Sequence, residues 1–346
     1  MKTIMKTLLV SIASLSMMFS ANSGELSVSG TAKATYAVSS GDVTSSNGIG
    51  VTNELNFTAS GEMDNGYTWS YSMELDPSTA GTADSTTVAP SGSAINDDTQ
   101  ISLTMNDLGT VKFCVSECGN NKKYAWDNSA YTSMSDTGFS EGIVYPSDEG
   151  AYASMQYHTP ELPFGTTASA AHGQSKKDGQ SGNAFSTAGG NSMTAYSLVT
   201  KPIDGLTVSA SYYEINEYDD GAPANQVEQG GAYAAKFAIN NVTLGYGKSL
   251  KAPEGTSIAT GATTVEYYEN VGMSVAYAVN DDLSISIGDQ TTEKDGSDVD
   301  QEVSGISVGY SMGGMTISAH ANEGDNVGHT ANSTSEHTEV SITFAF

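Results

Sequence analysis

Apolar and polar side chains alternate along this chain with a period of two, from about residue 25 to the last residue. Five large apolar residues, for example, take every second position of one segment: Tyr67, Trp69, Tyr71, Met73 and Leu75. Successive side chains of a β-strand point to opposite faces, so the pattern predicts strands with one apolar and one polar face. The apolar face needs a cover, which either lipid or a second sheet can supply.

The alternation divides into sixteen segments, most of them close to about ten residues, which is the length that a tilted strand needs to cross a bilayer. We predict strands at 25–38, 51–63, 66–76, 98–106, 109–117, 149–158, 164–174, 190–202, 205–215, 228–240, 241–250, 262–280, 282–293, 301–312, 314–322 and 336–346. The twelfth segment is long enough to project beyond a membrane.

Short and long connections alternate between these segments. The short ones are rich in Asn, Asp and Gly, which tolerate the positive φ of tight hairpins. The long ones lie near 39–50, 77–97, 118–148, 175–189, 216–227, 251–261, 294–300 and 323–335. This sorting puts every short turn and both chain ends on one side, as in barrels with short periplasmic turns and long external loops. It predicts an all-β, 16-stranded antiparallel transmembrane β-barrel.

The first 23 residues have the features of a secretory signal peptide. Lys2 and Lys6 precede a short apolar run, 8–19, and the small residues Ala21 and Ser23 have the spacing of a cleavage site. We therefore expect a signal peptide at 1–23, a barrel at 24–346, and export through the periplasm to the outer membrane. The run is too short, and too soon followed by polar chain, to be a good spanning helix.

The charge balance is strongly acidic. Residues 24–346 hold 11 lysines against 40 acidic residues, a net charge of −29, and no arginine occurs anywhere in the chain. Nothing in such a chain could neutralise phosphates, so nucleic-acid binding is excluded. An acidic surface around a confined pore concentrates cations, although acids on external loops also serve solubility alone. Only 38% of the residues are hydrophobic, which suits a barrel with a wet interior.

Catalytic and metal-binding patterns are weak. Two cysteines and five scattered histidines do not predict a zinc site, and no nucleophile motif points to an enzyme. Acidic pairs in turns are candidates for loosely bound Ca²⁺ at most, and no other cofactor is expected. Cys114 and Cys118 would be about 13 Å apart in an extended strand, too far to bond, whereas a turn at 116–118 would join them. A disulfide between them stays open.

Three stretches resemble the general diffusion porins of Gram-negative outer membranes, nearest the alphaproteobacterial group. These are Glu25–Lys33, where a basic residue follows a Ser-Gly pair, the hairpin formed by Ile101–Met105 and Leu108–Phe113, and the final Phe346. The resemblance implies a sixteen-stranded barrel, a homotrimer, and a third loop folded inward to narrow the pore. A C-terminal aromatic residue resembles the signature that such barrels present to the outer-membrane assembly machinery.

The third long connection, 118–148, stands where that family has its constriction loop. We expect it to fold inward and to present Asp127, Asp136 and Glu141 to the lumen. Its length and its aromatic residues favour an ordered loop, because long loops in compact proteins are usually functional. The alternative is an external loop without a role in the pore.

The opposite wall of the constriction departs from the family, which usually lines it with arginines. Here we expect Lys33, Lys112 and Lys236 to face the lumen, because a lysine in lipid near midplane costs about 2–4 kcal/mol. Lysine is a flexible point charge, so it cannot form a rigid planar stack. A second interpretation, that these lysines only neutralise acids such as Glu54 and Glu74, stays open.

The sequence thus favours a porin for passive diffusion of small hydrophilic solutes and ions, with a mild preference for cations. A substrate-specific outer-membrane channel is one alternative. A secreted acidic β-rich adhesin or surface protein is another, since it would share the composition.

Overall fold

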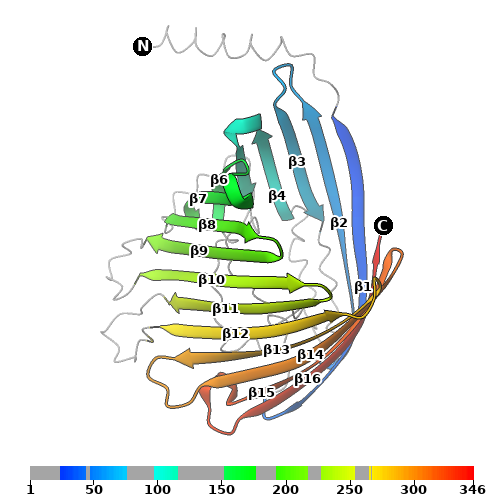
Figure 1. Ribbon diagram of the computed structural model, residues 1–346, viewed down its shortest axis with the longest axis vertical. Helices are drawn as coiled ribbons and strands as arrows, with labels where there is room; N and C mark the ends of the chain where they lie inside the picture. The colour runs from blue at the N-terminus through cyan, green and yellow to red at the C-terminus, as the bar shows by residue number, and fades with distance from the viewer. Residues whose placement is uncertain are drawn as a thin grey trace, which may run out of the picture.

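A computed structural model describes residues 24–43, 47–75, 97–115, 152–176, 192–216, 227–253, 265 and 267–346. Within these ranges the chain forms sixteen antiparallel strands, each paired with its neighbours in sequence, and β1 pairs with β16 to close a barrel. Figure 1 follows the strands in chain order around the cylinder and shows the C-terminus beside β1. The predicted fold class is confirmed.

The strand bounds run as follows: β1 Glu25–Gly41, β2 Gly48–Glu62, β3 Thr68–Leu75, β4 Asp97–Thr104, β5 Thr110–Val115, β6 Tyr152–His158, β7 Thr167–Lys176, β8 Ser192–Ile203, β9 Leu206–Asn216, β10 Glu228–Ile239, β11 Val242–Ala252, β12 Tyr268–Ala278, β13 Leu283–Lys294, β14 Gln301–Met312, β15 Met315–Asp325 and β16 Thr334–Ala345. The described part holds no α-helix, so no helix there could span a membrane.

The long twelfth segment predicted at 262–280 was wrong at the positions that the structure describes. The twelfth strand is Tyr268–Ala278, an ordinary eleven residues, and 265, 267, 279 and 280 are not in a strand. The longest described strand is instead β1, with 17 residues. Alternation marks side-chain faces, but it continues past the last ladder hydrogen bond, so it does not fix where a strand ends.

Closure of the barrel depends on the two ends of the chain. The register of β1 with β16 runs from Thr31 opposite Ala345 to Gly41 opposite Ser335. Beyond it, Gly30 and Phe346 exchange backbone hydrogen bonds of 2.8 and 3.0 Å. An open edge in lipid would leave backbone groups without partners, so this last pair completes the ladder that membrane insertion requires.

The short turns use backbone conformations that few side chains adopt. Gly109 follows the turn at 106–108 with φ +86, and a Cβ there would collide with the carbonyl oxygen of His158. Gly205 has φ +76, and a Cβ there would collide with the carbonyl oxygen of Ala238. Glycine is required at both turns because the chain must bend tightly beside a neighbouring strand.

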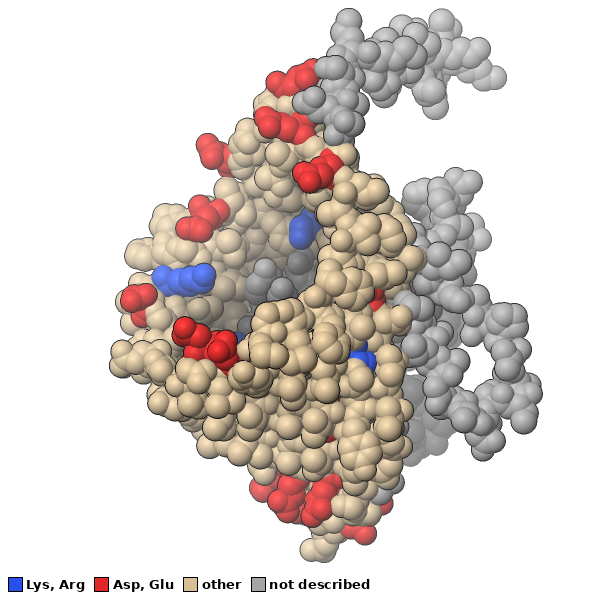
Figure 2. All heavy atoms as spheres, turned by 90° about the vertical axis from the view of Figure 1, so that its right-hand side faces the viewer, with Lys and Arg blue, Asp and Glu red and all other residues tan. Residues whose placement is uncertain are grey.

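The two faces of the barrel wall have inverted polarity compared with a soluble protein. On β13, Ile285 and Ile287 are exposed on the outer face, and Ser286, Gln290 and Thr292 are buried on the inner face. The same alternation recurs in the other long strands, with large apolar side chains outside. On the face drawn in Figure 2, most acidic side chains lie toward the edges, and lysines with one acidic group lie in and around a central hollow in an otherwise uncharged surface. An apolar exterior around a polar interior suits a cylinder standing in lipid.

Candidate pore lining

The inner face of the wall carries the three predicted lysines. Lys33 on β1, Lys112 on β5 and Lys236 on β10 each take the inward parity of their strands. They do not form one cluster, because at least three other strands separate each from the next. Adjacent strands lie about 4.8 Å apart, so β1 and β5 are about 19 Å apart along the wall.

Two lysines of the inner wall are paired with acids. Lys33 Nζ lies 3.0 Å from Glu339 Oε1 on β16, and Lys251 Nζ lies 3.0 Å from Glu228 Oε1 on β10. Glu228 also accepts a hydrogen bond of 3.2 Å from the hydroxyl of Tyr213. Of the three predicted lysines, Lys33 is thus paired with an acid, which is Glu339 rather than Glu54 or Glu74, and a role in the constriction stays a prediction.

The acidic half of the predicted constriction lies outside the described residues. Asp127, Asp136 and Glu141 belong to the segment 118–148, and their place in the lumen stays a prediction. Cys114 is buried on the inner face of β5, and Cys118 also lies outside the described residues, so the question of a disulfide stays open.

A buried hydrogen-bond network occupies the inner face of β11, β12 and β13. Asn270 is at its centre: the side-chain oxygen accepts from the Thr292 hydroxyl at 2.7 Å and from the Gln290 amide at 3.4 Å. The amide of Asn270 donates to the Ser249 hydroxyl at 3.3 Å. Buried polar groups that satisfy one another in this way hold neighbouring strands in a single register.

A second polar group lies at mid-height on β15 and β16. His320 and His337 are buried, with ring centroids 5.8 Å apart, and Glu339 lies beside them, half-enclosed by the wall. Glu339 Oε2 is 3.9 Å from His337 Nε2, on the other side of the carboxylate from Lys33. The group therefore combines two imidazoles, one carboxylate and one ammonium on one inner face.

An open space adjoins this group. A cavity of about 520 Å³ is bordered by Lys33, His320 and Glu339 at one end and by Asp281 and Asp282, in the turn between β12 and β13, at the other. It leads from the short-turn end of the barrel to mid-height. Of the polar group, the cavity therefore reaches His320 and Glu339.

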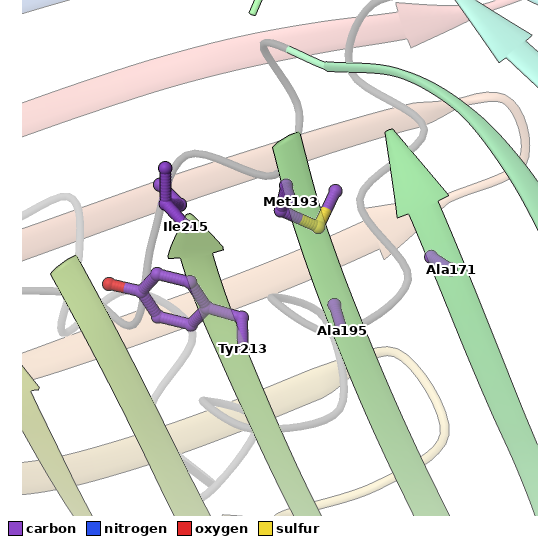
Figure 3. Close-up of a cluster of buried hydrophobic side chains, with 5 residues drawn as sticks. All are labelled: Ala171, Met193, Ala195, Tyr213 and Ile215. Carbon is purple, nitrogen blue, oxygen red and sulfur yellow. The ribbon is translucent and has the colours of Figure 1, made fainter. Parts of the chain in front are cut away.

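A third region of the inner wall is apolar. Its side chains come from three neighbouring strands, β7, β8 and β9, and Figure 3 shows them together: Ala171, Met193, Ala195, Tyr213 and Ile215. Met193 is 1% exposed and Ala195 0%. This part of the inner wall is therefore shielded from water, which the sequence did not lead us to expect.

At the long-loop end, the outer face carries polar and aromatic groups. Tyr267 donates a hydrogen bond of 2.9 Å to Glu293, and this bond, with the charge of the carboxylate, raises the pKa of the tyrosine. Lys248 pairs with Glu269 at 2.5 Å nearby. Tyrosines with one polar end suit the boundary between lipid and water.

Sequence reasoning missed the histidine pair because its members are 17 residues apart. A signal existed: β15 and β16 form a hairpin in which His320 is opposite Glu339, and Asn322 is opposite His337. Given that register, the three side chains point to the same inner face and lie next to one another across the hairpin. The register itself depends on the loop 326–333, whose conformation the alternation does not encode.

Comparison with known proteins gives a family and a fold. A model of the family described as Gram-negative porin matches residues 7–346, and no curated protein matches the chain. Among solved structures, the anion-selective porin from Comamonas acidovorans is 12% identical, with 93% of this chain and 100% of that one covered and a TM-score of 0.69.

Two further solved structures are similar. OmpF of Salmonella typhi, in complex with daunomycin, is 14% identical over 95% of this chain and 100% of that one, with a TM-score of 0.65. The trimer form of OmpT from Vibrio cholerae is 12% identical over 94% and 100%, also with a TM-score of 0.65. At these identities the likeness to solved structures shows the fold alone.

Proposed function

The chain belongs to the Gram-negative porin family and is an outer-membrane channel, and from this premise we propose that it passes small hydrophilic solutes by passive diffusion, with a preference for cations. The observation that carries the proposal is the polarity of the wall: serines, amides and charged groups line the inside of a closed cylinder, and large apolar side chains cover the outside. A secreted adhesin would have no need of this inversion.

The preference for cations rests on charge. Residues 24–346 have 40 acidic residues against 11 lysines, and Asp281 and Asp282 stand where the cavity meets the short-turn end. The lysines that pair with Glu339 and Glu228 are neutralised by them, which leaves the excess of acids to set the potential of the channel. The anion-selective porin with the same fold indicates that the fold does not decide selectivity.

The test is a planar bilayer experiment with the purified protein under a salt gradient. We expect single-channel conductance and a reversal potential of the sign that cation flow produces. A reversal potential of the opposite sign would disprove the preference, and the absence of conductance in correctly folded, heat-modifiable protein would disprove the channel.

The narrowest part of this channel, in our proposal, is the loop 118–148 folded into the lumen. Support comes from the apolar region of the inner wall on β7–β9. Met193 and Ala195 there are shielded from water, although the inner face of an empty barrel would be wet. A loop carrying Trp126 and Tyr131 has the side chains to cover such a patch.

We also propose a homotrimer. The trimer form of a solved porin with this fold supports it. Chemical cross-linking in mild detergent, read on gels with and without heating, should give a species of three chains that falls to one on boiling. A monomer that conducts and does not cross-link would refute the trimer and leave the channel intact.

A further inference from the structure

We propose that His320, His337 and Glu339 form a binding site for a transition-metal ion such as Zn²⁺ on the inner wall of the barrel. Two imidazoles and one carboxylate are a common ligand set for such ions in proteins. One ligand atom from each of the three side chains lies within 4.8 Å of the others. None of the three is among the constriction residues predicted from the sequence.

Strand geometry explains why these three side chains meet. His337 and Glu339 are two residues apart on β16, so they share a face, and His320 on β15 is directly opposite Glu339. His320 and His337 are therefore diagonal neighbours across one ladder, a relation that leaves long side chains within reach of each other. The site is part of the rigid wall, near the middle of both strands.

The present distances are close to those of a bound ion. Ligand atoms about 2.0–2.1 Å from a tetrahedral zinc are about 3.4 Å from one another. His337 Nε2 and Glu339 Oε2 are 3.9 Å apart, and the whole set lies within 4.8 Å. Small rotations of the side chains, of about one ångström at their tips, would bring the three donors to one ion without moving the strands.

Lys33 orients the carboxylate. It pairs with Oε1 of Glu339, and the other oxygen, Oε2, turns toward His337. One oxygen of the carboxylate is thus held by the ammonium, and the second remains directed at the imidazoles. A hydrogen-bonded partner behind a ligating carboxylate fixes the orientation of the ligand.

The chemistry of the donors selects the ion. Imidazole nitrogen favours Zn²⁺, Ni²⁺, Co²⁺ and Cu²⁺, whereas Ca²⁺ and Mg²⁺ prefer sets made only of oxygen. Burial of His320 at 8% and His337 at 6% exposure limits competition from water, and the adjoining cavity of about 520 Å³ gives a path for the ion and room for a water ligand. A divalent cation diffusing through the lumen would therefore be retained at this point of the wall.

Metal binding is measured on the folded full-length protein in detergent, by titration calorimetry with Zn²⁺ and by the visible absorption of Co²⁺, in the presence of excess Ca²⁺. We expect one ion per chain and a Co²⁺ spectrum of nitrogen-containing four-coordination. His320→Gln and His337→Gln should each weaken binding by more than about tenfold, since even partners behind the ligands contribute about 10–100-fold.

Two variants sharpen the test. His158→Gln removes an inner-face histidine on β6, away from the site, and should bind as the unchanged protein does. Glu339→Gln keeps the size of the side chain, so it reports the loss of a ligand even if a histidine variant fails to fold. Equal Zn²⁺ affinity in the unchanged protein and all variants, or displacement of Co²⁺ by Ca²⁺, would overturn the site. Because binding is read without conductance, either result leaves the proposed channel function untouched.

Discussion

Two arcs of the same inner wall differ in the polarity of their side chains. The arc from β7 to β9 presents small and apolar side chains, such as Ala171, Ala195 and Met193, that are shielded from water. The arc from β11 to β16 presents amides, hydroxyls and histidines, with Asn270 and His320 among them. One arc offers an apolar packing surface and the other offers ligands and hydrogen bonds, so the two sides of the inner wall differ in chemistry although both hold buried side chains.

The largest effect should come from a cavity in the apolar arc. Met193→Ala removes a fully buried side chain, and we expect a loss of about 2–5 kcal/mol in the free energy of unfolding. The measurement is denaturant unfolding of the barrel in vesicles. Met155→Ala is the matched control, because Met155 lies on the outer face of β6 and is 55% exposed, so its truncation leaves no enclosed cavity. Equal losses would show that the apolar arc is not a packed surface.

Loss of hydrogen bonds in the polar arc should lower the free energy of unfolding. Asn270→Leu keeps the number of side-chain heavy atoms but removes the acceptor of the Thr292 hydroxyl and one of the two acceptors of the Gln290 amide, at a cost of about 1–3 kcal/mol. The same unfolding experiment measures it. Ser304→Ala, on the outer face of β14, serves as control, and a loss no larger than that control would contradict the network.

The difference between the arcs also shows what the sequence pattern can and cannot predict. Alternation is local, so it placed Lys33, Lys112 and Lys236 on inward positions. The contact of Asn270 with Thr292, or of His320 with His337, depends on hairpin register, which turn geometry sets and a period of two cannot reveal.

The apolar arc could not be predicted from the sequence for a different reason. On β9, Tyr212 points outward and Tyr213 inward, so both faces carry apolar bulk and the period becomes ambiguous. Which face is covered depends on what packs against it from elsewhere in the chain. The fold was thus predictable from many weak local signals. Which part of the inner wall is apolar and which forms polar networks was not.

Ion selectivity should change by a smaller amount. Neutralising the predicted constriction acids together, by Asp127→Asn, Asp136→Asn and Glu141→Gln, should lower the cation-to-anion permeability ratio several-fold, equivalent to about 1 kcal/mol. The reversal potential under a salt gradient measures this ratio. A change of this size would locate selectivity in the loop rather than in either arc of the wall.

The matched control for selectivity removes the same charge elsewhere. Asp289, Glu323 and Glu336 are exposed on the outer face of β13, β15 and β16. The triple variant Asp289→Asn, Glu323→Gln and Glu336→Gln should leave the permeability ratio almost unchanged, because these groups do not face the lumen. Similar shifts in the two triple variants would mean that net charge, and not a constriction, sets the preference.

The smallest effect concerns the loop that joins the two strands of the histidine pair. Burial lowers the pKa of His329 below its usual 6.5, although its Nδ1 lies 3.2 Å from the carbonyl oxygen of Val299, a contact that favours the protonated form. The folded loop therefore prefers the neutral ring, and its stability is complete above pH 6.5 and declines as the pH falls below that value. The protection factors of the amides across 327–334, which correct for intrinsic exchange, should fall as the pH drops below 6.5. His329→Gln should abolish that fall, and its persistence in the variant would assign it to other groups near the ring, such as Asp300 and Lys294.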